Sequence, residues 1–289
     1  MIGLGLIGTA LAARLIDARI HVIGFDIDPA RCSAFGEIGG EPAASIRDVM
    51  ARCRTIIIAV YSGAQARSLF DEIGPASDLS HALMICVTTC APHEIASVAE
   101  RAEAARLPLV EAPLSGTSAE VREGRATALV AGRPPAIEAA GSLLDVLCPR
   151  QMRVGRIGDA ARTKLAINLI LQANRAALAE GIAFAEATGL DGATFLAIAK
   201  QSAAYSRVMD SKGERIVARD FTPQSHIAQT LKDAELILQE GARCGQMLPV
   251  TSVQAGLLRE TIARLGEDSD SAAIIEAIRP SENNSGAAP

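Results

Sequence analysis

Short apolar runs alternate with helix-forming segments through the first half of the chain, and this alternation restricts the possible folds more than any other feature. The runs that we expect to form strands are, in order, residues 2–5, 21–26, 55–60, 83–87, 108–112, 126–132 and 151–155. Helical patterns lie between them at residues 9–18, from Pro29 onward, and at 64–73, 92–105 and 135–147. Continuous apolar strands joined through helices are typical of a parallel sheet covered on both faces. The sequence therefore predicts an α/β fold with a doubly wound parallel sheet.

The pattern changes after the GRIG sequence at residues 155–158, where strands give way to helices alone. Helices are expected at 160–188, 191–203, 226–243 and 249–265, with a short one near 271–278. A chain of 289 residues also exceeds what one hydrophobic core usually supports. We therefore predict an α/β domain at residues 1–157, an all-α domain at 158–279 and a disordered polar tail at 280–289.

Composition and charge exclude several classes of function. The formal net charge is −5 and no basic run with interleaved aromatics occurs, so we expect neither a nucleic-acid partner nor an anionic membrane. The six cysteines and four histidines lack the spacing of a zinc site, and no metal is expected. No apolar run reaches the roughly 20 residues that span a bilayer, and the apolar start lacks the positive charge of a secretory signal. We expect a cytoplasmic protein.

A glycine motif joins the first expected strand to the first helix, as in a Rossmann-type nucleotide-binding domain. Gly3, Gly5 and Gly8 match GxGxxG, whose glycines allow a tight turn, close approach of a pyrophosphate and packing of helix on strand. Asp26 ends the second strand at about the spacing expected of an acid that binds the adenosine ribose, although an acid here could also cap the following turn. Its charge would repel a 2′-phosphate, so we predict NAD rather than NADP. The segment expected to contact the cofactor also includes Leu6 and Ile7.

Polar residues follow two of the expected parallel strands, where ligands collect in open α/β sheets. Ser115, Gly116 and Thr117 come shortly after the strand at 108–112, and a hydroxyl with a flexible backbone could hold a carboxylate there. The same residues could instead form a turn that caps the next helix. Thr88 and Thr89 follow the strand at 83–87 and allow the same two interpretations.

The segment 160–190 is long, free of proline and apolar on nearly every face, which predicts a buried helix. Lys164 and Asn168 lie within it four residues apart, so they stand on one face. They could be catalytic, or they could be a lysine that extends to solvent and an asparagine bonded to a neighbouring backbone. Lys232 and Asp233 lie on a later amphipathic helix, where such a pair is usually solvated.

Five segments in this order resemble the β-hydroxyacid dehydrogenase family, which includes 3-hydroxyisobutyrate, threonate and tartronate semialdehyde enzymes. They are GLGLIG (3–8), VTTCAP (87–92), EAPLSGTSAEVREGRATALVAG (111–132), GDAARTKLAINL (158–169) and LKDAEL (231–236), and they extend over nearly the whole chain. Many members have a second glycine where this chain has Thr117. Cys86 replaces an acid that is frequent before the threonine segment.

The resemblance implies a role for each matching residue. It makes Lys164 the catalytic lysine and Asn168 its partner, with Ser115 and Gly116, beside Thr117, in the loop that holds the substrate carboxylate. It further implies that the cofactor contacts include Thr89, Lys232 and Asp233.

The activity that we predict from these residues is reversible hydride transfer between NAD and a small 3-hydroxy acid, with Lys164 as general acid/base. A lysine ordinarily has a pKa near 10.4, so acting as a base near neutrality would require burial or nearby positive charge. The alternatives are an imine reductase of the same fold, a prephenate-type dehydrogenase, and a protein that binds the dinucleotide without turnover. The apolar helical half predicts a homodimer or homotetramer.

Overall fold

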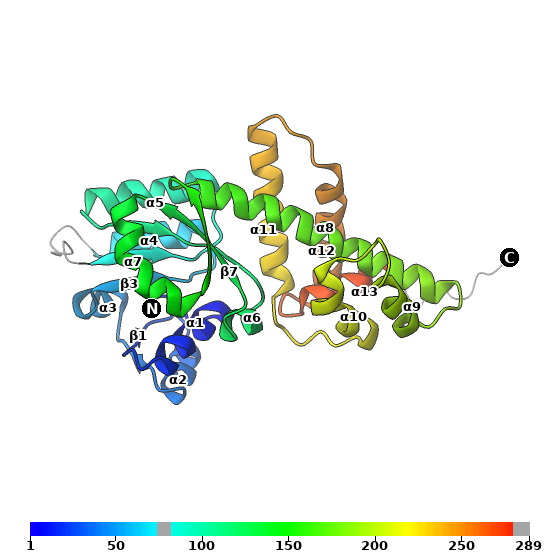
Figure 1. Cartoon of the computed structure of the whole chain (residues 1–289), viewed down its shortest axis with the longest axis horizontal. Coiled ribbons are helices and arrows are strands. Elements are labelled where there is room, and N and C mark those ends of the chain that lie inside the picture. Colours follow the sequence, from blue (N-terminus) through cyan, green and yellow to red (C-terminus); the bar gives the residue numbers. More distant parts are fainter. Residues whose placement is uncertain (74–81, 280–289) are drawn as a thin grey trace. The chain divides into compact units, whose positions relative to one another are not determined.

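The computed structural model describes residues 1–73 and 82–279, so the predicted disordered tail at 280–289 lies outside the described residues. The chain divides into two compact units, Met1–Leu165 and Ala166–Pro289 (Figure 1). The division falls inside one long helix, a few residues after the predicted boundary at 157/158. That boundary stays a prediction.

The first unit alternates strands and helices, as the sequence predicts. Its elements are α1 (Leu6–Asp17), β1 (Ile23–Gly24), α2 (Pro29–Glu37), β2 (Glu41–Pro42), α3 (Ile46–Arg52), β3 (Thr55–Ile58), α4 (Gly63–Ile73), β4 (Leu83–Cys86), α5 (Pro92–Ala104), β5 (Leu109–Glu111), β6 (Leu114–Ser115), α6 (Ser118–Arg122), β7 (Thr127–Gly132), α7 (Pro134–Leu147) and β8 (Arg150–Gly155). The strands β3, β4, β5 and β7 lie within the predicted runs, and β8 begins one residue before its run. The short elements β2, α3, β6 and α6 were not predicted.

Parallel pairing joins β3 to β4, β4 to β5, β7 to β8, and β1 to β2 in a separate short sheet. Alternate residues of one strand face opposite sides of the sheet: Ile56 and Ile58 belong to one buried cluster, and Ile57 to the other. The sheet is therefore covered on both faces, and the predicted doubly wound α/β fold is confirmed.

The sheet differs from the prediction in one respect, because β7 runs antiparallel to both β5 and β6. Only a short connection containing α6 separates β6 from β7, and antiparallel neighbours need no long crossover. The first expected strand, at residues 2–5, is reduced to Ile2, which forms parallel bridges to Phe25 and Ile58. Ile2 thus links β1 to β3.

The second unit is helical. Helix α8 (Asp159–Ala187) enters it from the first unit and is followed by α9 (Gly192–Ala199), the π-helix Met209–Gly213, α10 (Glu214–Ala218), α11 (Ile227–Arg243), α12 (Pro249–Leu265), a 3-10 turn at Ser271–Ile274 and α13 (Ile275–Ile278). A third cluster of buried apolar side chains, including Ile182, Ile216 and Leu258, forms its core. Within the described residues, no helix is both long enough and apolar enough to cross a membrane.

The sequence predicted that α8 is apolar on nearly every face and buried. The structure buries only part of its surface. Ile170 and Phe184 lie on one side and are 60% and 70% exposed in the single chain. The opposite side contacts the core through residues such as Leu178 and Ile182. The helix is therefore buried along one side, with large apolar side chains on its exposed side as well.

Candidate active site

The glycine motif forms a tight turn that opens into α1. Gly3 has φ +90°, and its N–H donates to the Phe25 carbonyl at 2.9 Å. A Cβ on Gly8 would come within 2.0 Å of the Gly3 carbonyl oxygen, so the helix packs directly on the turn. Helix α1 begins at Leu6 and includes Gly8, with the Thr9 N–H donating to the Gly5 carbonyl at 2.9 Å, whereas the sequence placed the helix start after Gly8.

Gly5 leaves the approach to this helix open. It is the N-cap residue of α1, no side chain caps the helix there, and a Cβ on Gly5 would meet nothing nearer than Arg31, at 3.8 Å. Unsatisfied N–H groups at a helix N-terminus attract anions. The turn thus fits the pyrophosphate of a dinucleotide.

Asp26 is buried and has a structural contact with this turn. Its Oδ2 accepts a hydrogen bond from the Leu4 N–H at 2.7 Å, and its Oδ1 accepts one from the Asp28 N–H at 3.0 Å. Asp28 in turn caps α2 through the Ala30 N–H. Arg31 lies 3.5 Å from both Asp26 and Asp28. Two carboxylates therefore lie beside the Arg31 guanidinium.

The threonines after β4 have different roles. The Thr88 hydroxyl accepts from the Val60 N–H and also lies 3.1 Å from the Val60 carbonyl oxygen, to which it can donate. Thr88 thereby ties the carboxyl end of β4 to that of β3. Thr89, the residue expected to contact the cofactor, is partly exposed at the same strand end.

The loop after β5 carries Ser115, Gly116 and Thr117. Gly116 has φ +154°, and a Cβ there would come within 2.9 Å of Ala126. The Thr117 side chain accepts from the Glu120 N–H at 3.2 Å, and Glu120 accepts from the Thr117 N–H at 2.8 Å. This reciprocal pair caps α6, as the turn interpretation of these residues predicted, and the substrate contact of Thr117 stays a prediction. Ser115, at the end of β6, is only partly buried.

Lys164 is 6% exposed in the second turn of α8. The start of this helix is fixed by Glu111, the last residue of β5, whose role was not predicted from the sequence. Glu111 accepts hydrogen bonds from the Gly158 and Ala161 N–H groups, both at 2.6 Å. Burial raises the pKa of Glu111 to about 7, against the opposing effect of these two N–H donors.

Asn168 meets Asp233 within the second unit. The Asn168 amide nitrogen donates to Asp233 Oδ2 at 2.8 Å, and both side chains are buried. Lys232 lies 3.0 Å from Asp233 Oδ1. The Asn168 carbonyl oxygen has no hydrogen-bond partner among the described residues. The structure therefore joins three predicted site residues, and Asp233 fixes which end of the Asn168 amide is engaged.

Two buried polar residues of α8 were not predicted. The Gln172 side chain donates to the Thr230 carbonyl at 3.2 Å and accepts from Gln254 at 2.8 Å. Arg175 is 6% exposed, and its Nε and Nη1 have no hydrogen-bond partner in the described part of the chain. Asn168, Gln172 and Arg175 follow Lys164 by 4, 8 and 11 residues, so all four lie along one face of the helix. This spacing was visible in the sequence.

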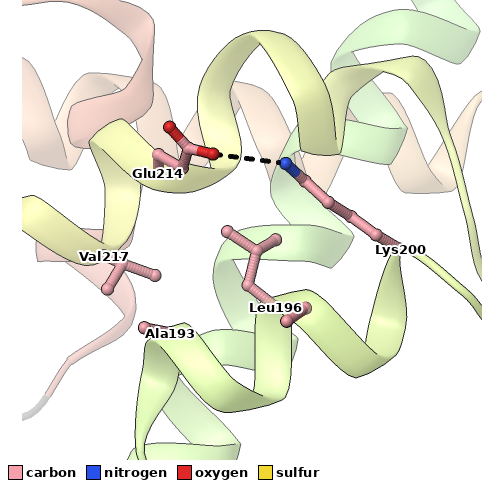
Figure 2. A pocket seen from close by; sticks show the side chains of 6 residues that line it. Ala193, Leu196, Lys200, Glu214 and Val217 are labelled. Atoms are coloured by element: carbon pink, nitrogen blue, oxygen red, sulfur yellow. Dashed lines mark hydrogen bonds and ion pairs between the residues drawn. The ribbon is translucent and has the colours of Figure 1, made fainter.

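A hollow of about 320 Å³ lies elsewhere in the second unit, and none of the predicted site residues lines it. Its wall includes Leu196, Val217, Lys200 and Glu214. The Lys200 Nζ donates to Glu214 Oε1 at 3.5 Å. Figure 2 shows these two side chains pointing toward one another. Within residues 1–73 and 82–279, no group of three His, Cys, Asp or Glu residues is placed to hold a metal ion.

Two family models match successive parts of the chain. Residues 1–155 match the family model described as the NAD binding domain of 6-phosphogluconate dehydrogenase. Residues 158–278 match the one described as NAD-binding of NADP-dependent 3-hydroxyisobutyrate dehydrogenase. The chain belongs to the β-hydroxyacid dehydrogenase family. The predicted enzyme class, an NAD(P)-dependent dehydrogenase that acts on the CH–OH group of a hydroxy acid, is thereby confirmed.

Relatives within this family have similar length. L-Threonate dehydrogenase of Cupriavidus necator is 27% identical over 95% of this chain and 94% of its own. 2-Hydroxy-3-oxopropionate reductase of Escherichia coli is 28% identical over 98% and 97%. The crystal structure of a 3-hydroxyisobutyrate dehydrogenase from Salmonella typhimurium shares the fold, with a TM-score of 0.84 at 22% identity over 95% of this chain and 97% of that one.

Proposed function

We propose that the protein is an NAD-dependent oxidoreductase of a small 3-hydroxy acid or of the corresponding semialdehyde or keto acid. One observation carries the proposal: α8 holds a buried lysine and, one turn later, an asparagine whose amide is oriented by a carboxylate. A purely structural asparagine would have its carbonyl oxygen bonded as well. The two curated relatives support the substrate class, since their names give a hydroxy acid and a hydroxy-oxo acid.

In this proposal each residue has a defined part. When bound, NAD supplies the acceptor for the hydride that leaves the carbinol carbon. Lys164 takes the hydroxyl proton during oxidation and returns it during reduction. Asn168 uses its free carbonyl oxygen to orient the lysine ammonium or the substrate hydroxyl. Ser115 and the Gly116 backbone hold the carboxylate, so that the carbinol carbon keeps one orientation.

The contacts proposed for the cofactor are those of the glycine turn, including Leu6 and Ile7, together with Asp26, Thr89, Lys232 and Asp233. The turn has the open helix N-terminus that a pyrophosphate requires.

The proposed preference for NAD over NADP rests on Asp26 and Asp28. Both carboxylates lie beside Arg31, so a 2′-phosphate would have to compete with two negative charges for one guanidinium. The test compares kcat/KM for the two cofactors in the wild type and in Asp28→Ser, which keeps a capping hydroxyl and removes one charge. We expect a wild-type preference for NAD and a shift toward NADP in the variant. Equal kcat/KM values for both cofactors in the wild type would contradict the proposal.

A panel of hydroxy acids with NAD, followed by the absorbance of NADH, tests the activity itself. Lys164→Ala should reduce kcat by roughly 100- to 10,000-fold, the usual contribution of general acid/base catalysis, while NADH affinity changes little. Wild-type turnover in this variant would exclude Lys164 as the proton-transfer group. Turnover of cyclic imines but of no hydroxy acid would favour an imine reductase, and absence of any turnover despite NADH binding would favour a non-catalytic protein.

We also propose that the protein forms a homodimer or homotetramer. Large apolar side chains of the helical unit are exposed in the single chain: Phe184, Leu190, Ile198, Val250 and Val253 are 58–70% exposed. Apolar groups of this kind are typical of interfaces. Light scattering after gel filtration at micromolar concentration should give a multiple of the chain mass, and a monomeric mass would contradict the proposal.

A cytoplasmic location is part of the same proposal. It is supported by the six cysteines, all of which are free.

A further inference from the structure

The buried carboxylate of Glu111 connects three parts of the first unit. As the last residue of β5 it is paired with Cys86 of β4 on one side and with Ala131 of β7 on the other. Its backbone is thus fixed inside the sheet, and its side chain is only 2% exposed. A carboxylate this deeply buried is costly unless its hydrogen-bonding capacity is used.

That capacity is used at the start of α8. Oε2 accepts from the Gly158 N–H and Oε1 from the Ala161 N–H, both at 2.6 Å. The first N–H groups of a helix have no partner within the helix, and here a side chain 47 and 50 residues earlier in the sequence satisfies two of them. Lys164 follows Ala161 by three residues, or less than one turn.

The same residue also precedes the Ser115–Gly116 loop. The chain after Glu111 is held in the sheet, because the Ala112 N–H donates to the Cys86 carbonyl at 2.8 Å. Ser115 lies four residues beyond Glu111. One side chain therefore sets the position of α8 relative to the strand from which this loop emerges.

We propose that Glu111 is a positioning residue for Lys164: by binding the Gly158 and Ala161 N–H groups it fixes the second turn of α8 relative to the Ser115 loop. This inference rests on the proposed function, in which Lys164 exchanges the substrate proton. Glu111 acts through the backbone, and its removal changes where the lysine amine lies without removing the amine. A displacement of about 1 Å at a reacting group can cost on the order of 100-fold in rate.

The chain offers a matched control at the same helix end. Asp159 Oδ2 accepts from the Arg156 N–H at 2.9 Å, so it also stabilises the start of α8, but it does not connect the helix to the sheet. Glu111→Gln keeps the shape of the side chain and presents an amide N–H₂ to one of the two N–H donors. Asp159→Ala removes the hydrogen bond between the first residue of α8 and the Arg156 N–H that precedes the helix. Both variants should lower the melting temperature.

Turnover should separate the two variants. We expect Glu111→Gln to lower kcat about 10- to 100-fold, with the NADH dissociation constant within about twofold of wild type; NADH fluorescence reports binding, since the chain contains no tryptophan. Glu111→Asp, one methylene shorter, should lie between Gln and wild type. Asp159→Ala should keep kcat within about threefold. Equal losses of kcat in Glu111→Gln and Asp159→Ala, or a wild-type kcat in Glu111→Gln, would overturn the proposal.

Combining variants distinguishes this proposal from the function on which it rests. If Glu111 acts through Lys164, the double variant Glu111→Gln/Lys164→Ala should be no slower than Lys164→Ala alone. A further tenfold loss in the double variant would refute positioning of Lys164. If Lys164→Ala turns over like wild type, the proton-transfer role proposed for Lys164 fails, whatever Glu111→Gln does. If Lys164→Ala is inactive while Glu111→Gln is normal, only the positioning role fails.

Discussion

Asn168→Leu tests whether the oriented amide on α8 serves chemistry or only packing. Leucine has nearly the shape of asparagine, so the substitution removes the 2.8 Å hydrogen bond to Asp233 and the unpartnered carbonyl oxygen without opening a large cavity. Gln172→Leu is the matched control. Gln172 is equally buried, lies one turn further along α8 and also bonds to α11, through the Thr230 carbonyl.

The expected stability losses of the two variants are similar. Asn168 loses one hydrogen bond to a charged acceptor, which is worth about 1.5–3 kcal/mol. Gln172 loses two neutral hydrogen bonds, to Thr230 and Gln254, each worth about 1 kcal/mol. Both variants should therefore lower the free energy of unfolding by roughly 2 kcal/mol, or the melting temperature by about 4–8 °C.

Their effects on turnover should differ by about two orders of magnitude. If the Asn168 carbonyl oxygen orients the proton-transfer group, its loss should lower kcat on the order of 100-fold, and Gln172→Leu should stay within about threefold of wild type. Steady-state kinetics with the best hydroxy acid of the panel, together with calorimetric melting, measures both quantities. Equal kcat values in the two variants would refute the catalytic role of Asn168 and leave it a role in packing alone.

Three further outcomes follow from the contacts above. Gly8→Ala should lower the melting temperature by several degrees, because its Cβ would lie 2.0 Å from the Gly3 carbonyl oxygen. In Gly5→Ala the nearest atom to the new Cβ is 3.8 Å away, so this variant should have the melting temperature of the wild type. It should bind NADH at least roughly tenfold more weakly, because the new Cβ lies at the open helix N-terminus. The pKa of Glu111 is raised to about 7, so this carboxyl binds a proton more readily in the folded state than in the unfolded state. Between pH 5 and pH 8 the free energy of unfolding of the wild type should therefore fall by up to roughly 3 kcal/mol relative to Glu111→Gln, measured by urea titration. A difference that stays constant with pH would contradict this. Lys212→Ala removes the ammonium that lies 2.7 Å from the buried Asp270 carboxylate. The free energy of unfolding, measured by the same titration, should fall by about 3–5 kcal/mol. A loss below about 1 kcal/mol would contradict this expectation.

The sequence predicted most of the fold because periodicity reports which faces are buried. Runs such as 55–60 and 83–87 became β3 and β4, and the segment 160–188 became α8 within one residue at each end. Strand direction is not encoded in that pattern, so the antiparallel pairing of β7 could not be predicted. The strand β2 contains only Glu41 and Pro42, which have no apolar periodicity at all.

The site was predicted less completely, for a related reason. Local signals were present and in part overlooked: Thr117 and Glu120 have the spacing of a capping box, which the structure contains. Contacts that join distant segments left no such signal. Glu111 could be read only as part of a motif, since its two donors lie 47 and 50 residues further along the chain.

Helix α8 shows what these distant contacts accomplish. Each polar side chain on an otherwise apolar face carries a desolvation cost that its own helix cannot offset, because the helix backbone is already bonded to itself. The partners therefore come from other elements: Asp233 for Asn168, and Thr230 with Gln254 for Gln172. Glu111 adds the same kind of contact at the helix start, where backbone N–H groups do lack partners. Each contact therefore holds the turn of α8 beside it: Glu111 the turn before Lys164 within the first unit, and Asp233 the turn that carries Asn168 within the second.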